Sequence, residues 1–159
     1  MIQELQTKIS GALQSYFGYD KFRPLQQEVI QHILQKKDGL LLMPTGGGKS
    51  ICYQIPTLVQ EGMTVVISPL ISLMTDQVAA LNRNGVKASA LHSAMSRASE
   101  DQLRDDLSEG RVQILYTSPE RFVGERFQNF LRSQNVHLFA IDEAHCISCL
   151  LYTSDAADE

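Results

Sequence analysis

Long apolar runs are missing from this chain of 159 residues. No stretch approaches the roughly 20 consecutive apolar residues that a membrane-spanning helix needs. The first twenty residues are amphipathic and lack the apolar block of a secretory signal. These absences predict no membrane partner. They also predict a cytoplasmic location, associated with the nucleoid in a bacterium, or a nuclear location in a eukaryote.

Cysteine is scarce, and positive charge is not in excess. The three cysteines are Cys52, Cys146 and Cys149, and the last two are spaced like half of a zinc site with no second half. We therefore expect free thiols. The formal net charge of −4 argues against a protein whose whole surface binds nucleic acid. It leaves room for a local basic strip, or for contacts through backbone amides and hydroxyls.

Apolar segments alternate between helical and strand-like patterns along the whole chain. Helices are predicted over 2–17, from Pro24, from Lys49, and over 70–81, 97–107 and 119–131, with Gly124 as a candidate break. Buried strands are predicted over 39–43, 65–67, 88–91, 112–116 and 138–141. Apolar strands separated by helices predict an α/β fold with a mostly parallel sheet and helices on both faces.

A glycine-rich loop stands between a predicted strand and a predicted helix, in the segment 43–50 (MPTGGGKS). Its glycines let successive backbone N–H groups point at one anion, and the helix that follows adds partial positive charge. Lys49 can reach the β- and γ-phosphates of a nucleotide, and the Ser50 hydroxyl can hold Mg²⁺. The predicted nucleotide-binding residues of this loop are Thr45, Gly46, Gly47, Gly48, Lys49 and Ser50.

Two carboxylates follow the last predicted strand, in the segment 138–145 (LFAIDEAH). At the carboxyl end of a parallel strand they lie at the edge of the sheet where ligands bind. Asp142 can hold Mg²⁺, Glu143 can polarise the attacking water, and His145 can couple the nucleotide site to neighbouring elements. Taken alone, the pair would be a helix N-cap with a first-turn acid, but the phosphate loop upstream favours the catalytic interpretation.

Three further stretches resemble the RecQ family of helicases. Residues 17–26 (FGYDKFRPLQ) resemble that family's adenine-recognition motif, FGxxxFRxxQ. The resemblance implies that Tyr19 stacks on adenine, that Gln26 contacts its edge and that Arg23 supports the site. An amide can donate to N7 and accept from the 6-amino group at the same time. An apolar N-terminal cluster of the aromatic residues here would not compete with that role.

Two strand-to-helix turns resemble the DNA-contacting motifs of the same family. Residues 66–78 (VISPLISLMTDQV) look like its SPLxSLMxDQ segment, and 116–121 (YTSPER) looks like its next DNA-side motif. Both turns combine hydroxyls with a helix N-terminus, which suits phosphate binding. By resemblance the DNA-contacting residues are Ser68, Pro69, Leu70, Ser118, Pro119 and Glu120.

The segment 142–148 (DEAHCIS) is the form of the acidic motif typical of RecQ proteins, whereas DEAD-box RNA helicases have Asp at the position of His145. Met43, where other P-loop enzymes have glycine, also favours a helicase. The resemblance covers residues 17–148. It implies a first RecA-like P-loop NTPase domain of an ATP- and Mg²⁺-dependent 3′-to-5′ DNA helicase. Such an enzyme acts on single-stranded and partly duplex DNA in repair and recombination.

The resemblance ends after Ser148. The family continues with an aromatic-rich loop that contains tryptophan, and this chain has no tryptophan. A back-translation of 149–159 resembles the transposase adapter of common sequencing libraries, so we expect an adapter-derived tail after a partial domain, 1–148. The strand that would lie between the phosphate-loop strand and the DEAH strand would then be absent. We expect exposed sheet edges and an isolated chain with negligible ATPase and helicase activity.

Two alternatives remain from the sequence. The first is an RNA helicase, which a nucleic-acid competition assay would separate from a DNA helicase. The second is a truncated, non-catalytic module that binds a nucleotide or a partner, which a genomic stop codon shortly after Ser148 would support.

Overall fold

The computed structural model describes residues 1–44, 46 and 48–144, and these form an α/β domain. Helical and extended elements alternate from α3 onward, as the apolar pattern predicts. The elements are α1 (Ile2–Ala12), the π-helical turn η1 (Leu13–Phe17), α2 (Gln26–Leu34), α3 (Lys49–Val59), β1 (Met63–Ile67), α4 (Ile71–Arg83), β2 (Ala88–Leu91), α5 (Arg97–Ser108), β3 (Ile114–Thr117), α6 (Pro119–Phe122), α7 (Glu125–Arg132) and β4 (Val136–Ile141).

The four strands form one parallel sheet in the order β2-β3-β1-β4. Its register pairs Ile67 of β1 with Thr117 of β3 on one side and with Ile141 of β4 on the other. The carboxyl ends of these three strands therefore reach the same edge of the sheet. The two DNA-side turns, after β1 and β3, and the acidic motif, after β4, lie at this edge. The phosphate loop precedes α3, which packs on one face of the sheet.

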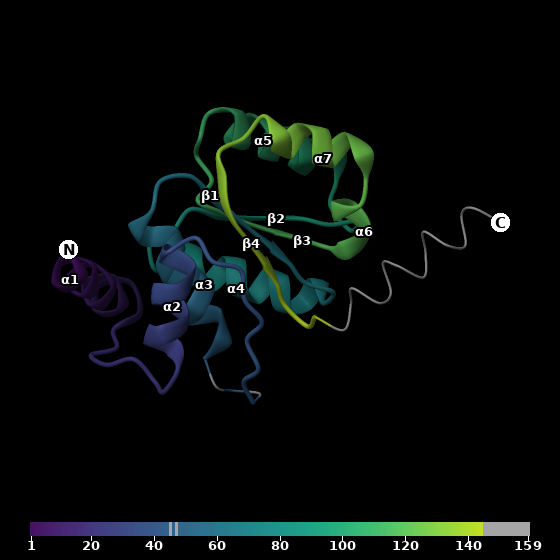
Figure 1. The fold of residues 1–159 in the computed structure, drawn as a ribbon. Helices are drawn as coiled ribbons and strands as arrows, with labels where there is room; N and C mark the ends of the chain where they lie inside the picture. The colour runs from purple at the N-terminus through teal and green to yellow at the C-terminus, as the bar shows by residue number, and fades with distance from the viewer. Residues whose placement is uncertain (45, 47, 145–159) are drawn as a thin grey trace.

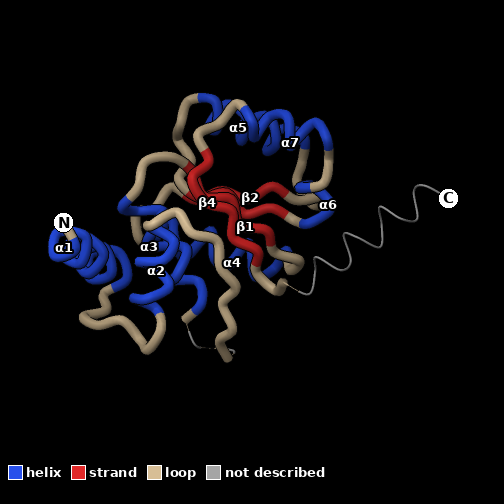
Figure 2. The backbone as a smooth tube through the Cα atoms, in the orientation of Figure 1, coloured by secondary structure: helices blue, strands red, loops and turns tan. Residues whose placement is uncertain are grey.

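Helices cover both faces of the sheet (Figure 1). Because side chains alternate along a strand, Val65 and Leu115 face one layer while Val66 and Tyr116 face the other. The first layer packs against α5, α6 and α7, and the second packs against α4 and α3. Helices α1 and α2 pack on α3 rather than on the sheet, around the buried Ile9, Ile30 and Ile55, and Figure 2 shows them beside α3 at the side of the domain.

The strand predicted over 39–43 is not formed, and this expectation was wrong for the structure described here. The segment has no regular secondary structure, and Leu40 and Leu42 are 76% and 81% exposed. A strand needs a neighbour for its backbone hydrogen bonds. Among the described residues, β4 is the last strand on that side of the sheet and no strand follows it toward residues 39–43.

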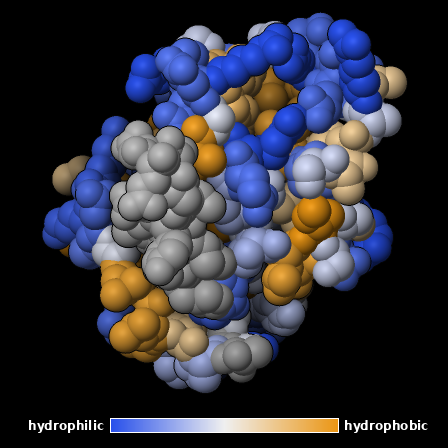
Figure 3. Space-filling view, turned by 90° about the vertical axis from the view of Figure 1, so that its right-hand side faces the viewer, coloured by the Kyte–Doolittle hydropathy of each residue, from blue (hydrophilic) through white to orange (hydrophobic). Residues whose placement is uncertain are grey.

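The unpaired edge leaves apolar side chains in solvent. Phe139 and Ile141 of β4 are 50% and 45% exposed, whereas every residue of β1 is buried. Figure 3 shows separate hydrophobic patches among hydrophilic residues on one face of the domain. Within the described part of the chain, no helix is long and apolar enough to cross a membrane.

Candidate nucleotide-binding site

The phosphate loop leads directly into α3. Gly46 and Gly48 have φ angles of 80° and 79°, in the left-handed region that glycine adopts without strain. Gly48 is the N-cap of α3, so the helix begins at Lys49 and its first backbone N–H groups face the loop. This is the arrangement that binds a phosphate group. Thr45 and Gly47, two predicted members of the loop, lie outside the described residues.

Arg23 and Gln26 hold the loop from the side. The Arg23 guanidinium donates to the Gly46 carbonyl at 2.6 Å, and the Gln26 amide donates to the Gly48 carbonyl at 3.0 Å. The Gln26 carbonyl oxygen also accepts from the Arg23 backbone N–H at 2.8 Å. A Cβ atom at position 48 would collide with the Gln26 amide, which is a second reason for glycine there. The adenine motif and the phosphate loop are thus one hydrogen-bonded unit.

These contacts bear on the role that the resemblance implies for Gln26. Its side chain is 3% exposed, and both of its amide atoms already have partners inside the protein. To contact adenine, Gln26 would have to replace at least one of these two hydrogen bonds with a hydrogen bond to the base. Tyr19, in contrast, is 54% exposed and lines the same cavity, so its ring is accessible for stacking.

The acidic motif lies where β4 ends. The Asp142 backbone N–H donates to the Ile67 carbonyl at 2.9 Å, which extends the β1–β4 ladder by one residue. Glu143 then has a φ of 56°, an unusual value for a residue with a side chain, and its N–H donates to the Asp142 carboxylate at 3.1 Å. Such strain is typical of functional sites. His145 lies outside the described residues.

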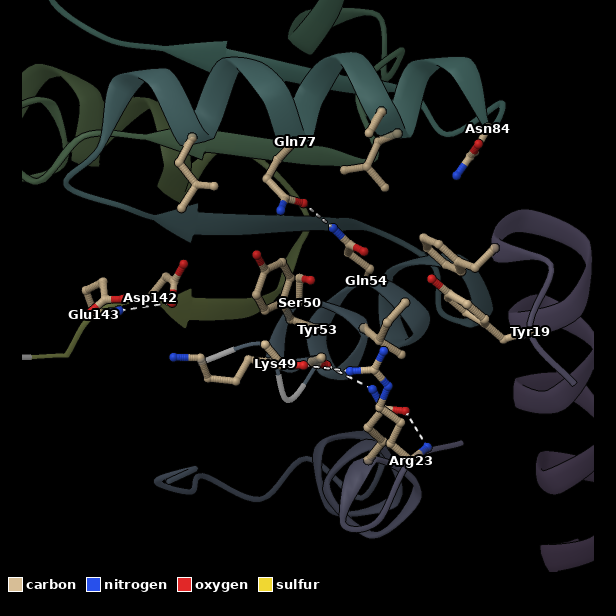
Figure 4. A pocket seen from close by; sticks show the side chains of 18 of the residues that line it. Tyr19, Arg23, Lys49, Ser50, Tyr53, Gln54, Gln77, Asn84, Asp142 and Glu143 are labelled. Atoms are coloured by element: carbon tan, nitrogen blue, oxygen red, sulfur yellow. Dashed lines mark hydrogen bonds between the residues drawn. The ribbon is translucent and has the colours of Figure 1, made fainter. Parts of the chain in front are cut away.

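A single cavity of about 500 Å³ brings the predicted nucleotide-binding residues together (Figure 4). Segments that are far apart in sequence line it: the adenine motif, the phosphate loop, the start of α3, one side of α4 and the acidic motif. The predicted residues among its lining are Tyr19, Arg23, Gln26, Gly46, Gly48, Lys49, Ser50, Asp142 and Glu143. This juxtaposition is the main structural support for the sequence-based site.

The lining also contains polar residues that were not among the predicted site residues, and three of them are hydrogen-bonded to one another or to Tyr116. Tyr53 and Gln54 lie on α3, and Gln77 lies on α4. Gln54 donates to Gln77 at 3.1 Å and to the Tyr116 hydroxyl at 3.2 Å. Helical spacing could have indicated the first two, because Tyr53 and Gln54 are four residues after Lys49 and Ser50 and so share their face of the helix.

Two phenols, the half-buried Tyr53 and the buried Tyr116, lie between the acidic motif and this glutamine pair. The hydroxyls of Tyr53 and Tyr116 are 3.4 Å apart, and their rings pack edge to face with centroids 6.4 Å apart. Burial raises the pKa of Tyr53 well above its ordinary value, with smaller contributions from Tyr116 and the negative charge of Asp142. Burial likewise raises the pKa of Tyr116. Both phenols are therefore neutral donors near the carboxylate at every physiological pH.

The oxygen donors of the cavity fit Mg²⁺. The Ser50 hydroxyl and the Asp142 carboxylate both line it, and Mg²⁺ prefers such oxygen ligands together with water and substrate phosphates. Across residues 1–44, 46 and 48–144, no cluster of three or more His, Cys, Asp or Glu side chains could hold a metal. One or two protein oxygens completed by a nucleotide is the usual composition of a magnesium site in such enzymes.

The two turns predicted to contact DNA are neighbours. The Ser68 N–H donates to the Thr117 carbonyl at 3.0 Å, so the turn after β1 lies against the turn after β3. The side chains of Ser68 and Ser118 are each 2% exposed, and neither hydroxyl has a hydrogen-bond partner among the described residues. Leu70, the N-cap of α4, is 53% exposed, whereas Pro119 is buried and Glu120 is an exposed acid.

The comparisons with known proteins agree with this geometry. Residues 23–155 match the family "DEAD/DEAH box helicase", so the chain belongs to that family. The chain is 47% identical to the ATP-dependent DNA helicase RecQ of Haemophilus influenzae over 92% of its own length, and 49% identical to RecQ of Bacillus subtilis over 89%. It covers 24% of each of these relatives, about a quarter of their length. The similarity supports a RecQ-family assignment.

Two solved helicase structures have the same fold. A hypothetical ATP-dependent RNA helicase from Sulfolobus tokodaii matches 94% of this chain with a TM-score of 0.70 and 23% identity, and the match covers 44% of that protein. Helicase MrfA, solved with DNA and AMPPNP, matches 87% of the chain with a TM-score of 0.71 and 23% identity, over 21% of its own length. The RecA-like fold class predicted from the sequence is therefore confirmed.

Proposed function

We propose that this chain carries the ATP-binding motifs of a RecQ-type DNA helicase, which couples ATP hydrolysis to 3′-to-5′ strand separation. The observation that carries the proposal is the single cavity in which α3, the adenine motif and the end of β4 meet. The identity of 47–49% to RecQ helicases favours DNA over RNA as the substrate.

Each group in the cavity has a role in phosphoryl transfer. The N–H groups at the start of α3 and the Lys49 ammonium would hold the phosphates. Ser50 and Asp142 would hold Mg²⁺, which neutralises charge on the phosphate oxygens. Glu143 would orient the attacking water, and Tyr19 would stack on the base. Catalysis then depends on holding Lys49 and Glu143 at a fixed separation across the sheet edge.

The DNA-side turns support a nucleic-acid substrate. The buried hydroxyls of Ser68 and Ser118, which have no hydrogen-bond partner among the described residues, lie next to the N-terminus of the thirteen-residue helix α4. A phosphate group at the N-terminus of α4 would meet oriented backbone N–H donors. Because the carboxylate of Glu120 would repel a phosphate, we expect it to act through its backbone.

The experiment uses the full-length gene product that contains this chain. Lys49→Ala and Glu143→Gln should each lower kcat for ATP hydrolysis by about 100-fold or more, the range typical of losing a charge-stabilising group or a general base. Glu143→Gln should still bind ATP. The matched controls are Lys37→Ala and Glu61→Gln, which remove the same charges at exposed positions. Unchanged hydrolysis in either site variant would overturn the proposed site.

The polarity and the substrate need separate measurements. A duplex with a 3′ single-stranded tail should be unwound faster than one with a 5′ tail. Single-stranded DNA should stimulate ATP hydrolysis more than RNA of the same sequence. Preference for RNA would favour the alternative of an RNA helicase. A role in DNA repair and recombination predicts that deletion of the gene sensitises cells to DNA-damaging agents.

A further inference from the structure

Four polar side chains form a continuous chain of hydrogen bonds, and three of them line the cavity. The chain begins at Gln77 on α4, passes through Gln54 on α3 and Tyr116 on β3, and ends at Tyr53 on α3. Figure 4 shows Gln77 pointing down from α4 toward Gln54, with Tyr53 on the side of Asp142. The chain therefore connects three elements that are otherwise joined mainly by apolar packing.

The direction of the first part of this chain, from Gln77 to Tyr116, follows from the donors that each group has. The Gln54 amide nitrogen carries two hydrogens, and it donates one to Gln77 Oε1 and one to the Tyr116 hydroxyl oxygen. The Tyr116 hydroxyl accepts from Gln54, and either of the two tyrosine hydroxyls can donate to the other across the 3.4 Å between their oxygens. Where Tyr116 is the donor, Tyr53 has its single hydrogen left for the cavity, which Asp142 also lines.

All four members of the chain lie close in sequence to a segment with a proposed role. Gln77 belongs to the helix that follows the Ser68 turn, and Tyr116 is two residues before Ser118 in the second DNA-side turn. Gln54 and Tyr53 lie one helical turn after Ser50 and Lys49. A shift of α4 or of the end of β3 would therefore change the hydrogen bonds near the phosphate-binding end of α3.

We propose that Gln54 and Gln77 are positioning residues that transmit occupancy of the DNA-side turns to the nucleotide site, through the orientation of the Tyr53 hydroxyl. This inference rests on the proposed helicase function. It requires Gln54 to donate in both directions, Gln77 to accept, and Tyr116 to donate to Tyr53. The burial of Gln54 and Tyr116 supports it, because a buried hydrogen-bonded network has few alternative arrangements.

The test compares two substitutions at one position in the full-length protein. Gln77→Met keeps the length of the side chain but removes the acceptor, whereas Gln77→Glu keeps the acceptor. We expect Gln77→Met to lower the ratio of DNA-stimulated to basal kcat by about 5-fold, the lower end of typical coupling between sites. Gln77→Glu should recover most of the ratio. Tyr53→Phe, which removes the last hydroxyl of the chain, should behave like Gln77→Met.

A ratio is measured because a merely structural role would lower both rates together and leave the ratio unchanged. Gln3→Met, the same exchange at an exposed position of α1, is the matched control and should leave both rates unchanged. A wild-type ratio in Gln77→Met, or no recovery in Gln77→Glu, would overturn the inference while leaving the helicase function standing. If the wild-type protein shows no DNA-stimulated hydrolysis, the proposed function itself fails.

Discussion

Strands β1 and β4 are neighbours in one sheet, but they lie in very different environments. All five residues of β1 are buried, with β3 on one side and β4 on the other. In β4 no residue is fully buried, and its outer edge faces no strand among residues 1–44, 46 and 48–144. The nucleotide site takes one residue from each environment. Lys49 belongs to a well-packed helix, and Glu143 follows the exposed strand.

This contrast shows that the phosphate-loop half of the site is held by more contacts than the acidic-motif half. The start of α3 is fixed by Arg23 and Gln26 and by the buried face of the helix. The end of β4 is fixed to the sheet on one side only, through β1. Catalysis requires both halves at a defined separation, so the exposed half should limit activity.

The largest expected effect concerns the activity of the 159-residue chain by itself. We expect its kcat for ATP hydrolysis to be at least about 100-fold below that of the full-length gene product, because displacing a catalytic group by about 1 Å can cost that much. Steady-state hydrolysis with saturating single-stranded DNA measures both proteins. Comparable rates would show that the β4 edge does not limit the geometry.

A second prediction concerns stability. Leu115 of β3 is fully buried in the cluster under α5 and α7, so Leu115→Ala should lower the free energy of unfolding by about 2–5 kcal/mol. Phe139 of β4 is half exposed and touches Phe122 edge to face, so Phe139→Ala should cost about 1 kcal/mol. Urea denaturation of the chain measures both. Equal losses would mean that the β4 edge is covered in solution.

A third prediction concerns the backbone of β4. Since Asp142 donates its N–H to β1, the N–H groups of Leu138 and Ala140 point to the same side, and those of Phe139 and Ile141 point to the outer edge. Amide exchange at Phe139 and Ile141 should be about 10-fold faster or more than at Leu138 and Ala140. Residue-resolved hydrogen exchange by NMR measures this. Uniform protection along β4 would contradict a free edge.

Local patterns were enough to predict most elements and the composition of the site. The periodicity indicated the positions of α3, α4, α5 and the strands from β1 onward. It also indicated the break at Gly124, which separates α6 from α7. The segment over 39–43 failed because strand formation depends on a partner distant in sequence, which no local apolar run can reveal. The expectation of a missing strand beside β4 came from the resemblance and stays a prediction.

The contacts within the site were less predictable than its composition. Two examples are the hydrogen bond from Gln26 to the Gly48 carbonyl and the connection of α4 to β3 through Gln54. Both depend on how separate elements pack, and neither follows from spacing alone. The assignment of 149–159 to an adapter-derived tail stays a prediction, since these residues lie outside the described part of the chain. Genomic DNA that spans codon 148 would test it.

The smallest expected effect is a pH dependence from the exposed strand. His137 of β4 lies 3.2 Å from the Thr64 hydroxyl of β1, through its Nε2 atom. Burial, and then the positive charge of Lys36, lower the pKa of His137 below its ordinary value of 6.5. The unfolded chain therefore binds this proton more readily than the folded one. The folded state should lose stability as the pH falls below about 6.5 toward the lowered pKa of His137.

Replacing His137 isolates this contribution. His137→Gln removes the titrating group, so the free energy of unfolding should fall less between pH 7.5 and pH 5.5 than in the wild type, as measured by urea denaturation at both pH values. His32→Gln, the same exchange at an exposed position of α2, should keep the wild-type difference. If His137→Gln also loses as much unfolding free energy as the wild type between the two pH values, then His137 is protonated in the folded state without loss of stability, because β4 is loosely held. The contrast between β4 and the buried strand β1 would then be larger than the structure shows.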